Sequence, residues 1–275
     1  ELAYCLACGG DDFLNKPLNP ILLNARIKIW LQRADLANRL ANDRADVENV
    51  ILRMRQDSHF DRAGLRVLMT PLGKTTGDIV LSARRTDGKH YLMVGDFAGH
   101  GLAAAICGPL VADLFYRLSQ KDVPMHEMIG QMNALICERL PINMFLSAAF
   151  VELDRSRGDM HVWNAAFPPV LLIRDGCVAD RCPAHLPLLG IQPDLEVPQE
   201  AWGRKWLEGD RGYLYSDGSV ETRSESGEFF GAERLETCIQ QELFPGGELE
   251  SLLDRLSRFK GTREWNDDIT IVEIT

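Results

Sequence analysis

The sequence lacks the features that mark several classes of protein. Its 275 residues carry a net charge of −10, which argues against a nucleic-acid partner, since such a partner requires a basic face. We find no signal peptide and no apolar run of about 18 residues, so no membrane segment is expected. Seven cysteines are an odd number scattered through apolar stretches. They favour reduced thiols and a cytoplasmic location over a disulfide framework.

Ligands for soft metals are also few. Cys5 and Cys8 form the one CxxC pair, and the six histidines include no pair at ligand spacing. A zinc or redox site would need a second ligand pair or a thioredoxin-like context. Packed helix cysteines are therefore the simpler interpretation.

Glycine and proline are absent from Ile21 to Ala63, where helix-forming residues dominate. This composition predicts one long helix, or two in series. Within it, apolar residues recur at heptad spacing, interrupted by Asp43 and flanked by charges: Leu36, Leu40, Val47, Val50 and Met54. A stripe this narrow predicts a homodimer through a coiled coil, and packing of the helix on its own domain is the alternative.

After Gly64 the pattern changes to short apolar runs and alternation with period two. These runs predict strands at 65–69, 79–83, 91–94, 145–153, 160–164, 170–174, 213–215 and 269–274. Helices are predicted at 101–118, 124–140, 231–243 and 248–260. The order of elements indicates an α+β fold in which antiparallel sheets are flanked by helices.

Four acidic signatures lie in order along this second part of the chain. They are Thr76-Gly77-Asp78, Gly95 to Gly101, Tyr215 to Gly218, and Asn266 to Thr270. Each lies at an end of a predicted strand, and any one of them alone is a common turn. Carboxylates brought together at strand ends suit hard divalent cations, and glycines allow the backbone to approach a bound ion closely.

From about Leu65 to the C-terminus these motifs resemble the metal-dependent PPM serine/threonine phosphatases, in their SpoIIE-like branch. Asn164 to Pro169, Glu221, and Phe230 to Leu235 add to the resemblance. It implies an αββα sandwich, preceded here by the long N-terminal helix. It also implies two Mn²⁺ or Mg²⁺ ions at one end of the sheets.

The resemblance also implies roles for individual residues. Asp96, Asp217 and Asp267 are expected to bind one ion. Asp96 would bridge to the second ion, which Asp78 and the Phe97 carbonyl would help to hold. Two ions that share a carboxylate activate a water for attack on phosphorus, so no protein nucleophile is expected.

The roles of two further residues stay open. Asp268 is expected behind the metal ligands, although it and Asp267 could exchange roles. His100 is a candidate catalytic acid for the leaving oxygen, with a capping or structural role as the alternative. Two departures from the family pattern, Ala98 and Ala166-Phe167, remove no acidic ligand.

The N-terminus has a resemblance of its own. Gly9 to Pro17, followed by an apolar helix, resembles the end of a response-regulator receiver domain, with Lys16 as its phosphate-contacting lysine. A plain N-terminal turn and helix is the alternative. The expected organisation is a receiver remnant at 1–33, a helical linker at 34–63 and a phosphatase domain at 64–275.

Together these resemblances imply the output phosphatase of a two-component response regulator. Its expected substrate is a phosphorylated anti-sigma factor antagonist in a partner-switching pathway. A catalytically silent adaptor of the same fold, which sequesters a regulatory protein, is the alternative.

Overall fold

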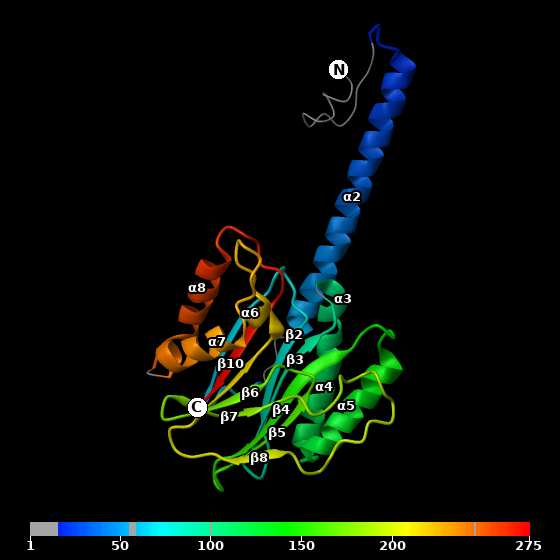
Figure 1. Ribbon diagram of the computed structural model, residues 1–275. Helices are drawn as coiled ribbons and strands as arrows, with labels where there is room; N and C mark the ends of the chain where they lie inside the picture. Colours follow the sequence, from blue (N-terminus) through cyan, green and yellow to red (C-terminus); the bar gives the residue numbers. More distant parts are fainter. Residues whose placement is uncertain (1–15, 55–58, 100, 245) are drawn as a thin grey trace. The chain divides into compact units, whose positions relative to one another are not determined.

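The computed structural model describes residues 16–54, 59–99, 101–244 and 246–275, and the chain divides between Val50 and Ile51 into two compact units. Helix α2, Pro20–Met54, forms most of the described part of the first unit and continues into the start of the second (Figure 1). Asn19 caps its N-terminus, because the side-chain oxygen of Asn19 accepts the N–H of Ile21 at 2.9 Å. Pro20 occupies the first helical position, where its missing N–H costs nothing.

The long helix predicted from Ile21 is thus confirmed, as one helix up to Met54. The prediction is wrong for residues 59–63, which are not helical. There the Asp61 side chain accepts the N–H of Ala63 at 2.9 Å, an Asx-type turn that competes with a helix. The heptad side chains from Leu36 to Val50 are 40–62% exposed, and the coiled-coil dimer stays a prediction.

The second unit is built on two five-stranded antiparallel sheets. Sheet A has the order β1 (Leu65–Thr70), β10 (Ile269–Ile274), β9 (Arg211–Tyr215), β6 (Val170–Arg174), β7 (Cys177–Cys182). Sheet B has the order β2 (Asp78–Arg84), β3 (His90–Phe97), β4 (Leu146–Asp154), β5 (Asp159–Ala165), β8 (Trp202–Lys205).

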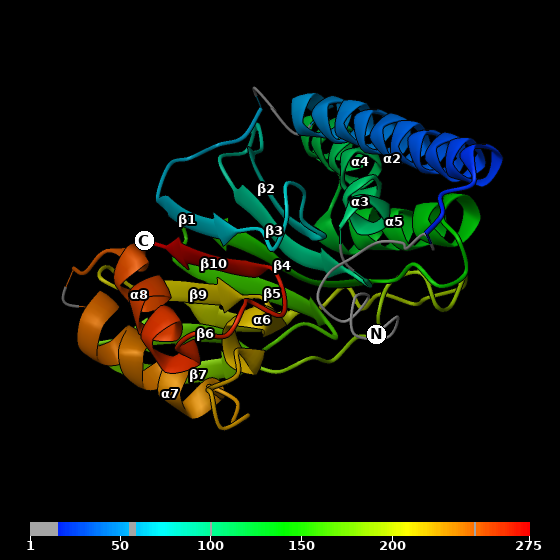
Figure 2. The ribbon, with the colours of Figure 1, turned by 90° about the horizontal axis from the view of Figure 1, so that it is seen from above.

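Helices cover the outer face of each sheet (Figure 2). Those beside sheet B are α3 (Leu102–Ala105), α4 (Cys107–Gln120) and α5 (Met125–Arg139). Those beside sheet A are α7 (Ala232–Cys238), the π-helix η1 (Ile239–Leu243) and α8 (Leu249–Lys260). A short helix, α6 (Asp217–Glu221), follows β9.

Alternation along β3 shows how the layers are held together. Tyr91 and Met93 pack in the cluster that includes α4 and α5, whereas Leu92 and Val94 pack in a second cluster with strands of sheet A. Successive side chains of a strand point to opposite faces, so β3 is buried on both of them. A third cluster joins sheet A to α7, η1 and α8. The predicted αββα sandwich is therefore confirmed.

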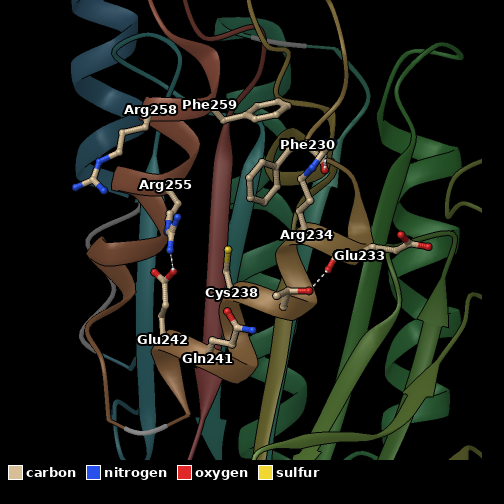
Figure 3. A pocket seen from close by; sticks show the side chains of 10 residues that line it. Phe230, Glu233, Arg234, Cys238, Gln241, Glu242, Arg255, Arg258 and Phe259 are labelled. Carbon is tan, nitrogen blue, oxygen red and sulfur yellow. Dashed lines mark hydrogen bonds and ion pairs between the residues drawn. The ribbon is translucent and has the colours of Figure 1, made fainter.

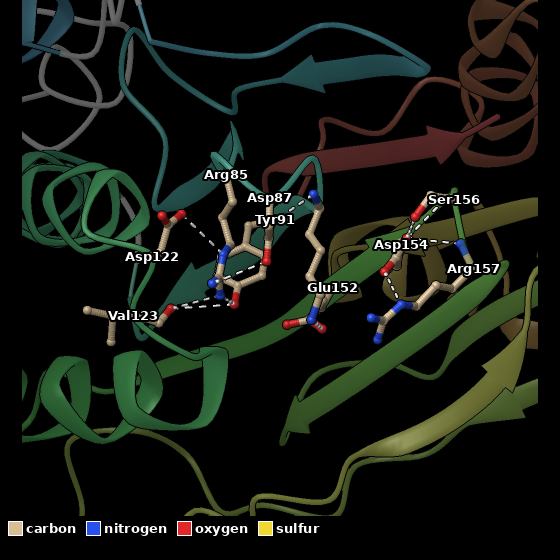
Figure 4. A network of polar contacts seen from close by, with 10 residues as sticks. Arg85, Asp87, Tyr91, Asp122, Val123, Glu152, Asp154, Ser156 and Arg157 are labelled. Atoms are coloured by element: carbon tan, nitrogen blue, oxygen red, sulfur yellow. Dashed lines mark hydrogen bonds and ion pairs between the residues drawn. The ribbon is translucent and has the colours of Figure 1, made fainter.

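A polar network joins sheet B to the loop between α4 and α5 (Figure 4). The Arg85 guanidinium donates to the Tyr91 hydroxyl and to the Val123 carbonyl, and it lies 3.4 Å from the Asp122 carboxylate. The Tyr91 hydroxyl in turn donates to the Val123 carbonyl at 3.4 Å. These contacts fix the helix pair onto the sheet that carries two of the acidic signatures.

Three elements escaped prediction. Strands β7 and β8 lie at sheet edges and are largely exposed, so they lack an apolar alternation, and α6 is a single turn. The helix predicted over 101–118 is divided at Ile106 into α3 and α4.

Leu102–Gln120, the stretch of α3 and α4, is long and apolar enough to cross a membrane. The prediction that the sequence has no such run is therefore wrong. By length and composition alone this stretch passes the test for a membrane helix. Most of it is nevertheless buried, with Val111 and Phe115 in the cluster beside sheet B. That burial is ordinary for the core helix of a soluble domain.

Candidate active site

Two of the predicted acidic residues lie opposite each other on sheet B. Asp78 begins β2 and is paired with Asp96 near the end of β3. Directly opposed residues project from the same face, with Cβ atoms about 4.5–5.5 Å apart. Asp96 continues the alternation of Leu92 and Val94, whose side chains pack between the sheets. Both carboxylates therefore face sheet A.

The other two come from neighbouring strands of sheet A. Asp217 is the first residue of α6, two residues after the end of β9, and Asp267 lies two residues before β10. The two turns are tied together at 2.9 Å in both directions, because Ser216 N–H donates to the Thr270 carbonyl and Thr270 N–H donates to the Ser216 hydroxyl. The structure thus places all four predicted acidic signatures at one end of the sandwich.

Close approach of the backbones requires glycine at Gly218. A Cβ at this position would lie 2.1 Å from the Asp268 carbonyl oxygen and 3.2 Å from the Asp267 Cβ. The Ser-Asp-Gly turn and the Asp-Asp segment are therefore in direct backbone contact.

The carboxylates raise one another's pKa. Burial is the largest cause of a raised pKa at Asp96, and the charges of Asp78, Asp217, Asp267 and Asp268 add to it. Burial likewise raises the pKa of Asp78, with Asp268 and Asp217 contributing. The pKa of Asp217 is raised by burial and by Glu221. Each of the charges that raise the pKa of Asp96 belongs to a carboxylate, so the site favours positive charge.

The Phe97 carbonyl lies close to the Asp96 carboxylate. A Cβ added to Gly77 would lie 3.2 Å from both Asp96 Oδ1 and the Phe97 carbonyl oxygen, so the two oxygens flank one point of the backbone. The Phe97 side chain is itself fully buried among residues that pack against α4 and α5. This packing fixes the direction of its carbonyl.

Asp268 differs from its neighbour Asp267 in its burial and in its hydrogen bonds to the backbone. It is 4% exposed, and its carboxylate accepts the N–H groups of Leu72 at 2.6 Å and of Gly77 at 2.9 Å. Asp267 is more exposed, and its carboxylate accepts the N–H of its neighbour Asp268 at 2.8 Å. This difference favours Asp267 over Asp268 as the residue that would bind an ion.

The donor set fits hard divalent cations in its chemistry. It consists of carboxylate and carbonyl oxygens, which such ions prefer. Asp78 Oδ2 is buried without a hydrogen-bond partner among the described residues, a costly state that a cation would relieve. As the side chains stand, however, no group of three or more His, Cys, Asp or Glu within the described ranges is arranged to hold an ion. Further oxygen donors or small side-chain movements are needed to complete a ligand shell.

Two other predictions fare differently. His100, the candidate catalytic acid, lies outside the described residues, as do Cys5, Cys8 and the rest of residues 1–15 of the expected receiver remnant. Ala166, at one of the two departures from the family pattern, has a φ of 52°. Glycine adopts this left-handed conformation more readily than other residues do. Phe167 is buried between the sheets and takes no part in the acidic site.

A pocket of about 590 Å³ lies away from these carboxylates, between α7, η1 and α8 (Figure 3). It is lined by aromatic and charged side chains, among them Phe230, Phe259 and the ion pair of Arg255 with Glu242. None of the predicted site residues lines it. Phe230, Glu233 and Arg234 of the Phe230 to Leu235 motif line it, but that motif alone did not indicate a pocket.

Two antiparallel sheets between helix layers, with acidic residues gathered at one end, define the class of PPM (PP2C-type) phosphatase domains. The SiaA-PP2C domain of Pseudomonas aeruginosa superimposes with a TM-score of 0.72 at 20% identity, over 86% of this chain and 98% of that domain. RsbX, solved in complex with magnesium, has a TM-score of 0.56 at 13% identity, over 76% of this chain and 92% of its own. These likenesses establish the fold.

The chain belongs to the Stage II sporulation protein E (SpoIIE) family, whose model matches residues 86–275. Among curated relatives, the phosphoserine phosphatase RsbU of Bacillus subtilis (strain 168) is 20% identical over 210 residues, which are 71% of this chain and 61% of RsbU. The chain spans less than two thirds of the length of the curated relatives it matches. The predicted family is thereby confirmed.

Proposed function

We propose that this chain is a metal-dependent protein serine/threonine phosphatase. The observation that carries the proposal is the convergence of Asp78, Asp96, Asp217 and Asp267 from both sheets onto one end of the sandwich. In a member of the SpoIIE family, a site that concentrates negative charge is best explained by the binding of divalent cations.

In this proposal the chain's residues bind and orient. Asp96, Asp217 and Asp267 would hold one Mn²⁺ or Mg²⁺ ion, and Asp96, Asp78 and the Phe97 carbonyl would hold the other. When bound, two such ions lower the pKa of a water molecule and neutralise a phosphoryl group during in-line attack. The link between Ser216 and Thr270 keeps Asp217 and Asp267 together. His100 is kept as the candidate donor of a proton to the leaving oxygen.

The substrate that we propose is a phosphorylated anti-sigma factor antagonist. RsbU, a phosphoserine phosphatase, supports the phosphoserine chemistry. The proposed setting is cytoplasmic partner switching, without nucleic acid or membrane partners. The chain would act as the output domain of a two-component response regulator, with residues 1–33 as its receiver remnant.

The exposed heptad side chains support a homodimer through α2. We propose that the dimer passes the upstream signal to the phosphatase domain through residues 34–63. Breaking the helix with Val47→Pro should then abolish regulation while leaving the basal activity of the domain. Regulation that survives this substitution would exclude the linker as its path.

One observation favours a second candidate function. Because the carboxylates form no ready-made ligand group in the described ranges, a catalytically silent adaptor that sequesters a regulatory protein is the alternative. The two functions differ in metal binding, which the enzyme requires and the adaptor does not.

Hydrolysis of a phosphoserine peptide with and without Mn²⁺ tests the proposal. We expect activity that requires Mn²⁺ and is lost in Asp96→Asn and in Asp217→Asn. Asp113→Asn is the matched control, because this carboxylate is 63% exposed on α4 and pairs with Arg117 at 2.8 Å. No hydrolysis with any divalent ion, together with no metal binding by calorimetry, would refute the enzyme and favour the adaptor.

A further inference from the structure

Asp268 contacts both ends of the segment that crosses from sheet A to sheet B. Its carboxylate accepts the N–H of Leu72, two residues after β1, and the N–H of Gly77, one residue before β2. Thr75 and Thr76 in between are buried, and the Thr76 hydroxyl accepts the N–H of Asp78 at 2.9 Å. The segment, residues 71–77, is therefore closed at its base by one side chain.

The backbone of Asp268 contacts the other side of the site. Its carbonyl accepts the Ser216 hydroxyl at 3.3 Å, and it lies against Gly218, where a Cβ would come within 2.1 Å. Asp268 thus touches the residue before Asp78 with its side chain and the residues on either side of Asp217 with its backbone. One residue connects the acidic groups of the two sheets.

We propose that Asp268 is a positioning residue that holds segment 71–77 closed over the acidic site. The closed segment keeps Gly77 against Asp96 Oδ1 and the Phe97 carbonyl, and it keeps Asp78 paired with Asp96. This inference rests on the proposed function for its catalytic consequence, but its structural part stands without it.

The chemistry requires a carboxylate. Two N–H donors reach Asp268 Oδ1 and Oδ2 separately. In Asp268→Asn an amide NH₂ group replaces one carboxylate oxygen. This group donates hydrogen bonds, so one backbone N–H loses its acceptor. A hydrogen bond to a charged acceptor is among the stronger ones in proteins, and its loss should open the segment.

Amide hydrogen exchange on the metal-free protein is the direct test. In Asp268→Asn we expect the Leu72 and Gly77 amides to exchange at least about tenfold faster than in the wild type. Trypsin should also cleave after Lys74, which lies inside the segment. Asp267→Asn is the matched control, since it removes the neighbouring charge while both N–H bonds remain. Asp268→Ser takes the place of the asparagine variant in both assays if that variant does not fold.

Calorimetry with Mn²⁺ separates positioning from ligation. Asp267→Asn should abolish binding at one site, whereas Asp268→Asn should weaken it by about 10–100-fold, as expected for residues behind the ligands. Unchanged exchange at Leu72 and Gly77 in Asp268→Asn would overturn the proposal. So would complete loss of Mn²⁺ binding in that variant with both amides still protected, because Asp268 would then be a ligand. Exchange is measured without substrate, so it decides the inference even if the wild type hydrolyses no phosphopeptide.

Discussion

Gly218→Ala tests whether the contact between the two turns of sheet A sets the geometry of the acidic site. The new Cβ would lie 2.1 Å from the Asp268 carbonyl oxygen, against an ordinary contact distance of about 3.5 Å. The Asp268 carbonyl belongs to the backbone, so it cannot avoid the new methyl group by changing a side-chain rotamer. The turn that carries Asp217 must therefore shift by on the order of 1 Å relative to Asp268. A displacement of that size typically reduces the rate of a positioned reaction about 100-fold.

The assay compares kcat and Mn²⁺ affinity of Gly218→Ala with those of Gly130→Ala. Gly130 lies inside α5, and a Cβ there meets nothing within 4 Å. Alanine at this position should leave activity unchanged and stabilise the domain by up to about 1 kcal/mol. Wild-type activity and Mn²⁺ affinity in Gly218→Ala would refute the reasoning. It would mean that the separation of Asp217 and Asp268 is not critical.

Three further predictions concern stability. His90 is 2% exposed and bonds through Nε2 to the Ser82 hydroxyl, and burial lowers its pKa from 6.5 to about 4. Its stabilising contribution should therefore be complete above pH 6.5, and about 3 kcal/mol of it should be lost between pH 6.5 and 4. The free energy of unfolding, measured with urea, should fall over this pH range in the wild type but not in His90→Gln. Glu273 is fully buried and pairs with Arg66 and Arg211. Glu273→Gln should therefore lower the free energy of unfolding by about 3 kcal/mol. The exposed control Asp113→Asn should lower it by less than about 0.5 kcal/mol. Removal of metal with EDTA should lower the melting temperature of the wild type but not of Asp96→Asn, because ions that bind only the folded state stabilise it; an equal effect on both proteins would contradict a site at Asp96.

Much of the fold could be predicted because its strands and helices are amphipathic or fully buried. The apolar runs of sheet B and the apolar faces of α4 and α5 give a clear signal. Edge strands β7 and β8 gave none, since an exposed edge has no burial to enforce alternation. The end of α2 was overestimated because the competing bond of Asp61 is a side-chain contact that composition does not record.

The gathering of the four carboxylates could be predicted from signatures at strand ends, although their roles as ligands stay predictions. What the sequence did not separate was Asp267 from Asp268. The distinction depends on the N–H groups of Leu72 and Gly77, almost 200 residues earlier in the chain. Only the folded chain brings such donors to one of two adjacent and chemically identical side chains.

The acidic groups differ in how firmly the fold holds them. Asp96 lies in register with Leu92 and Val94, so the core between the sheets fixes it. Asp217 and Asp78 follow a turn and a loop that are held by hydrogen bonds through Ser216, Thr270 and Asp268. Apolar packing is resistant to small displacements, whereas a few polar contacts can be exchanged at low cost. A signal that alters the site without unfolding the domain should therefore act on these polar links, and Asp96 should serve as the fixed reference against which the other carboxylates move.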